Sequence, residues 1–167
     1  MRSVISAIVT ISRFATGAAF FVLMGAVLIQ VLGRSVFLNS PVWTEELTRF
    51  ALLYLAAFGA GLSLRSGDLV NVDIIAESLP GAWPRRLRFL GAVATALLCA
   101  MLVLPAWKFT SIGAMQTSPA LGWRMDLIHA STLVLIVSLL IFASARALSM
   151  LFGLSNGLPH NRLEEEH

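Results

Sequence analysis

The apolar residues of this chain gather in four long stretches that contain no Asp, Glu, Lys or Arg. The stretches comprise 20, 15, 19 and 19 residues, at positions 14–33, 50–64, 89–107 and 127–145. A helix rises about 1.5 Å per residue and the hydrocarbon core of a bilayer is about 30 Å thick, so about 20 residues cross it. The pattern predicts four membrane-spanning helices within one domain over residues 1–154, with spans at about 14–34, 46–65, 87–107 and 127–150.

The second stretch is too short to cross a bilayer, because 15 residues reach only about 22 Å. To span, its helix must include Glu45, Glu46 and Arg49, or Arg65 must extend its side chain to the interface. The dipeptide Ser40-Pro41 predicts where this helix starts, with serine as the N-cap and proline in the first turn.

Two of the polar segments suggest further elements. Residues 66–84 fit a short amphipathic helix in the interface plane that stops at Leu79-Pro80-Gly81, although an ordinary loop remains an alternative. Its apolar face holds Val70, Ile74 and Ile75, and its polar face holds Asp73 and Glu77. We expect the polar tail over residues 155–167 to be disordered.

The basic residues predict the orientation of the chain. With both termini in the cytoplasm, eight of the 12 Lys and Arg residues lie on the inside and four on the outside. Because cytoplasmic segments carry the excess of Lys and Arg, this ratio favours an N-in, C-in topology. Arg85, Arg86 and Arg88, at the start of the third span, form the strongest single cue.

Composition agrees with an all-α integral membrane protein. Hydrophobic residues make up 57% of the chain and charged residues only 13%, and the mean hydropathy is +0.83. Soluble domains carry about 25% charged residues, and disordered chains have low hydrophobicity, so both classes are excluded. The net charge of +3 does not indicate nucleic-acid binding, because no polar domain gathers the basic residues.

The sequence contains no recognisable pattern of catalytic or cofactor-binding residues. Of the three histidines, His129, His160 and His167, only His129 falls within a span, whereas a haem needs two axial ligands. Cys99 is the single cysteine and is expected to pack as a small apolar residue. We therefore expect neither an enzyme nor a metal or cofactor site in this chain.

One polar group does call for an explanation, the segment Trp43-Thr44-Glu45-Glu46-Leu47-Thr48-Arg49. Arg49 lies four residues after Glu45 and three after Glu46, so either pair can meet on one helix face. Arg34 is a candidate second cation, and Trp43 is expected at the headgroup level. Two interpretations of the group stay open: a polar clamp that fixes helix geometry or a partner contact, and a solvated helix start with weak pairing.

Inside the spans, the sequence points to packing between helices. Gln30 is the deepest polar side chain of the first span, and we expect it to hydrogen-bond across helices. Small residues permit close helix approach at several positions of the second and third spans: Ala57, Gly61, Ala92, Ala96 and Ala100.

Several of these residues together resemble the small membrane subunit of the tripartite ATP-independent periplasmic (TRAP) transporters. The resemblance runs from about Arg13 to about Phe152. Its most specific piece is W-x-E-E-x-x-R at 43–49. The other pieces are Gln30-x-x-Gly33-Arg34, Pro41, Gly59-Ala60, Arg65-x-Gly67, Val72-Asp73 and Leu79-Pro80. The chain departs from the family at Leu69, where members often carry a histidine.

The resemblance implies a scaffold in the bacterial inner membrane rather than a transporter by itself. In that family, the small subunit braces a large membrane subunit, which carries the substrate and sodium sites. A periplasmic binding protein delivers an organic acid, and the sodium gradient drives its uptake. Membrane lipids are further expected partners. The structural or interface candidates are Gln30, Arg34, Trp43, Glu45, Glu46, Arg49, Arg65 and Asp73.

Two other classes remain as alternatives. A membrane anchor of a redox complex would bind haem or quinone, but only one histidine lies in a span. A small independent exporter would need an ionisable residue in mid-membrane, and spans one, three and four carry none between their ends.

Overall fold

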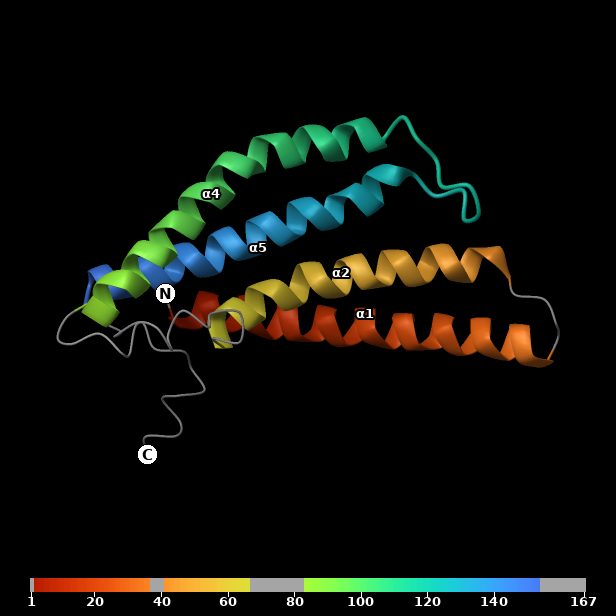
Figure 1. The fold of residues 1–167 in the computed structure, drawn as a ribbon, viewed down its shortest axis with the longest axis horizontal. Helices are drawn as coiled ribbons and strands as arrows, with labels where there is room; N and C mark the ends of the chain where they lie inside the picture. Colours follow the sequence, from red (N-terminus) through yellow and green to blue (C-terminus); the bar gives the residue numbers. More distant parts are fainter. Residues whose placement is uncertain (1, 37–40, 67–82, 154–167) are drawn as a thin grey trace. The chain divides into compact units, whose positions relative to one another are not determined.

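Four long helices make up the chain in order of sequence, as the computed structural model shows for residues 2–36, 41–66 and 83–153 (Figure 1). They are α1 (Arg2–Val36), α2 (Val42–Ser66), α4 (Trp83–Gly113) and α5 (Met125–Leu151). Each is long and apolar enough to cross a membrane. The predicted interfacial helix between 66 and 84 and the tail over 155–167 lie outside the described residues.

Each helix contains the span predicted for it and extends further at both ends. The second helix begins at Val42 and therefore includes Glu45, Glu46 and Arg49. This extra turn gives the helix the length that its 15-residue apolar stretch lacks, as the sequence required. Trp83 and Pro84 open α4, where a proline in the first turn loses no intrahelical hydrogen bond. The same helix continues through Pro105.

The described residues divide into two compact units, and each helix except α1 contributes to both. Unit 1 comprises Met1–Gly59 and Pro105–Leu135, and unit 2 comprises Ala60–Leu104 and Ile136–His167. Within unit 1, α1 runs beside the first part of α2 (Figure 1). Within unit 2, the first part of α4 runs beside the last part of α5, where Arg85 Nη2 donates to the Met150 carbonyl at 3.3 Å.

Small side chains fill the buried positions of the helices. Six of the eleven buried hydrophobic residues are alanines, and Ala57 and Ala143 are each only 1% exposed. On α4 the buried small residues are Ala92, Cys99, Ala106 and Gly113, at intervals of seven. Of the predicted packing residues on α4, Ala92 is buried within this chain, whereas Ala100 is exposed.

Two helices of unit 2 approach each other closely at Gly61. A Cβ atom placed there would lie 2.8 and 2.9 Å from ring carbons of Phe142, and it would also overlap the hydroxyl of Ser138. Both neighbours belong to α5. Only a residue without a side chain allows α2 to approach α5 this closely, as is typical of helix packing in membranes.

The outward faces of the helices are apolar. On α1, only 6% of the most apolar 18-residue segment is buried. Phe14 and Phe21 are 79% and 81% exposed. A surface of this kind is stable in lipid or against another membrane protein rather than in water.

Candidate functional site

The carboxylate of Glu46 on α2 binds the turn that joins α4 to α5. Its Oε2 atom accepts hydrogen bonds from the backbone N–H groups of Ala120 and Leu121, at 3.1 and 2.9 Å. The hydroxyl of Ser118 donates to the same oxygen. Three donors thus converge on one ionised acceptor, and hydrogen bonds to charged groups are the stronger kind. This contact links two segments more than 70 residues apart in the sequence.

The turn itself has a defined backbone that presents these donors. The Ser118 N–H donates to the Trp123 carbonyl at 2.8 Å, and the Gly122 N–H donates to the Ser118 carbonyl at 3.0 Å. Gly122 has a φ of 66°, a left-handed conformation that favours glycine. The Ser118 side chain is only 3% exposed. Successive N–H groups in such a turn form a concave site for an anion, and the Glu46 carboxylate occupies it.

The start of α2 holds Glu46 in position. Thr44 is fully buried, and its N–H and hydroxyl both donate to the Pro41 carbonyl, at 3.1 and 2.6 Å. The Thr48 hydroxyl donates to the Thr44 carbonyl at 2.7 Å. These local bonds fix the first two turns of the helix. The sequence prediction did not single out Thr44, although threonine hydroxyls commonly donate to a backbone carbonyl three or four residues earlier. Ser40, the predicted N-cap, lies outside the described residues.

Arg49 does not form the ion pairs that its spacing allowed. In the described part of the chain, no ion pair joins it to Glu45 or Glu46. Glu45 and Arg49 are exposed, and so is Arg34 at the end of α1. Trp43 is 38% exposed, as an interfacial side chain can be. Among the described candidates of this segment, Glu46 is the one whose side chain hydrogen-bonds to a distant segment of the chain.

The remaining candidates are Gln30, Arg65 and Asp73. Gln30 is half-buried on α1, and no hydrogen bond of its side chain occurs among the described residues. Arg65 lies in the last turn of α2. Asp73 lies outside the described residues.

An open apolar cavity lies next to the turn, within unit 1. It has a volume of about 360 Å³. The hydroxyl of Tyr54, one of the lining residues, donates to the Leu127 carbonyl and so joins α2 to α5. The lining residues are Ala19, Val22, Leu47, Phe50, Ala51, Tyr54, Trp123, Leu127 and Ile128.

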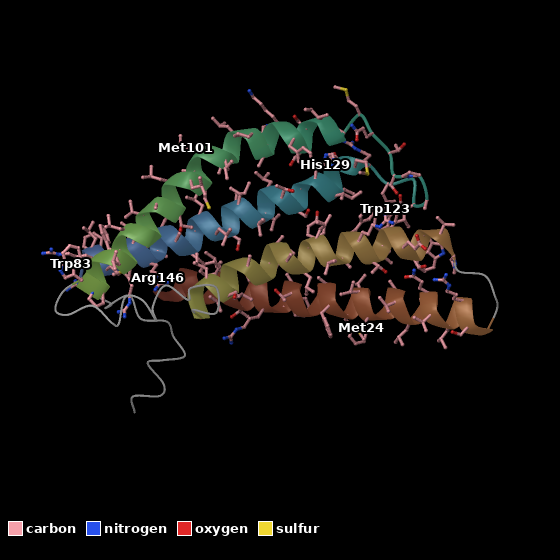
Figure 2. All side chains as sticks on the ribbon, viewed as in Figure 1. Met24, Trp83, Met101, Trp123, His129 and Arg146 are labelled. Atoms are coloured by element: carbon pink, nitrogen blue, oxygen red, sulfur yellow. The ribbon has the colours of Figure 1, made fainter. Side chains whose placement is uncertain are left out.

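His129 is engaged in packing between α4 and α5 (Figure 2). Its ring stacks on Phe109 with 4.1 Å between centroids, and Nδ1 lies 3.2 Å from the Phe109 carbonyl oxygen. The Thr110 hydroxyl also lies 3.3 Å from the His129 carbonyl. Within the described residues, no group of three or more His, Cys, Asp or Glu could hold a metal ion.

These features define a small multi-span helical membrane protein whose best-formed polar contact ties a helix start to a distant turn. Residues 23–153 match the family model described as "Tripartite ATP-independent periplasmic transporters, DctQ component". The chain therefore belongs to the DctQ family of TRAP transporter small permease subunits, which is a family of transporter subunits rather than of enzymes. With its four candidate spans, it is a protein of the bacterial inner membrane.

Two relatives from Haemophilus influenzae agree with this family. A putative TRAP transporter small permease protein is 21% identical over 131 residues, which cover 78% of this chain and 81% of the relative. The sialic acid TRAP transporter permease protein SiaT is 28% identical over 64 residues, or 38% of this chain. The chain spans only a tenth of the length of SiaT.

Proposed function

We propose that this chain is the scaffold subunit of a TRAP transporter, and that it braces a large membrane subunit during sodium-driven uptake of an organic acid. A periplasmic binding protein delivers the acid. The observation that carries the proposal is the family match over residues 23–153. The resemblance to SiaT, whose name states sialic acid, supports an organic acid as the class of substrate.

The distribution of polar groups supports a scaffold role. All four apolar stretches contain no Asp, Glu, Lys or Arg, whereas ion-coupled transport uses ionisable or carbonyl ligands within the membrane. The polar contacts at Glu46 and Tyr54 instead join one part of this chain to another. We therefore assign the sodium and substrate sites to the large subunit and none to this chain.

Co-purification tests the proposed partner. A tagged large TRAP subunit from the same organism is expected to retain the untagged full-length chain at about one copy each after solubilisation in mild detergent. A four-span membrane protein from another family, expressed at the same level, serves as the control and is expected to wash away. Elution of this chain apart from the large subunit, in several detergents and in native nanodiscs, would contradict the proposal.

A further inference from the structure

A second cavity lies within unit 2, at the start of α4 and the end of α5. It has a volume of about 370 Å³ and is lined by Arg85, Arg86, Phe89, Met150 and Leu151. Sites for small ligands commonly measure about 300–1,000 Å³. The cavity is separate from the Glu46 contact, which belongs to unit 1.

The two arginines provide positive charge that the described residues do not neutralise. Arg85 donates to the Met150 carbonyl at 3.3 Å, and the guanidinium carbon of Arg86 lies 5.9 Å from the ring centroid of Trp83. Neither makes an ion pair with an Asp or Glu among the described residues. Both side chains are exposed. A guanidinium group presents several donors in a planar fork that matches the oxygens of a phosphate.

The rest of the lining is apolar. Phe89 is half-buried, Met150 is 3% exposed and Leu151 is 66% exposed. Trp83, which is 55% exposed, stands beside Arg86. Tryptophan is the side chain typical of the membrane–water interface. A charged rim therefore adjoins an apolar wall at the expected headgroup level.

We propose that this cavity binds an anionic phospholipid. The phosphate lies against Arg85 and Arg86, and the first part of an acyl chain lies along Phe89 and Leu151. The charge selects an anionic over a zwitterionic headgroup, and the apolar wall selects a lipid over free phosphate. Basic pockets between membrane helices bind anionic headgroups in this way. The proposal does not depend on the transport role of the chain.

The expected selectivity follows from the two charges. Each Lys or Arg near an anionic lipid strengthens binding about five-fold, so two arginines favour phosphatidylglycerol over phosphatidylcholine by about 25-fold. Native mass spectrometry of the delipidated full-length protein, titrated with each lipid in turn, measures this ratio. We expect Arg86→Gln to lower the retention of phosphatidylglycerol about five-fold and Arg86→Lys to preserve most of it.

Lys108→Gln is the matched control. Lys108 is exposed on the same helix, near its opposite end, and the substitution removes the same charge. We expect it to change retention less than two-fold. Circular dichroism confirms that each variant is folded. Three results would overturn the proposal. They are equal retention of the two lipids, an equal loss of phosphatidylglycerol in Arg86→Gln and Lys108→Gln, and displacement of the lipid by inorganic phosphate at equal concentration.

Discussion

Gly61→Leu is expected to prevent the helices of unit 2 from packing, with most of the protein lost to aggregation during purification. The added side chain would occupy the space of the Phe142 ring and the Ser138 hydroxyl. Even the smaller Gly61→Ala places a methyl group 2.8 Å from the ring. Overpacking of this kind costs about 1–3 kcal/mol, so we expect Gly61→Ala to fold with a lower unfolding temperature.

Gly59 provides a matched control two residues earlier on the same helix. A Cβ atom at Gly59 meets no heavy atom within 4 Å. Because alanine favours a helix over glycine by about 1 kcal/mol, Gly59→Ala is expected to be neutral or slightly stabilising. Thermal unfolding in detergent, followed by size-exclusion chromatography, compares the variants. Similar unfolding temperatures for Gly59→Ala and Gly61→Ala would show that close approach at Gly61 is not needed.

Glu46→Ala is expected to lower the free energy of unfolding and to release the turn between α4 and α5. The substitution leaves the N–H groups of Ala120 and Leu121 without their acceptor, and hydrogen bonds to a charged group are stronger than those between neutral groups. We expect faster hydrogen exchange at these two amides. Glu46→Gln keeps an acceptor oxygen but loses the charge, so its effect should be intermediate.

Glu45→Ala serves as the control for the Glu46 variants. Glu45 is exposed on the same turn of α2 and carries the same charge, so its loss should change the free energy of unfolding by less than about 0.5 kcal/mol. If both alanine variants were equally stable, the hydrogen bonds to the turn would have no structural role. The same variants, co-expressed with the large subunit, show whether the turn contributes to assembly.

The helices could be predicted from the sequence because the thickness of a bilayer sets a minimum length for each apolar run. The exact ends could not be predicted, because polar residues such as Arg2 and Arg85 continue a helix without a change in backbone pattern. The inclusion of Glu45 and Glu46 in the second helix followed from the shortness of its apolar stretch.

Local sequence patterns could not predict the hydrogen-bond partners of Glu46. Spacing along one helix suggested Arg49, three residues away. The structure instead brings Ser118 and its neighbours to the carboxylate, through a turn whose position depends on how α4 and α5 pack. Similarly, the small residues predicted close helix contacts, but only the packed structure shows that Gly61 meets Phe142 and that Ala100 is exposed.

Uptake by reconstituted proteoliposomes tests the scaffold role most directly. The vesicles contain this chain, the large subunit, or both, and the periplasmic binding protein is added outside with its radiolabelled organic acid and an inward sodium gradient. We predict uptake only when both membrane subunits are present, and none with this chain alone. Uptake by this chain alone, or equal uptake by the large subunit without it, would contradict the account.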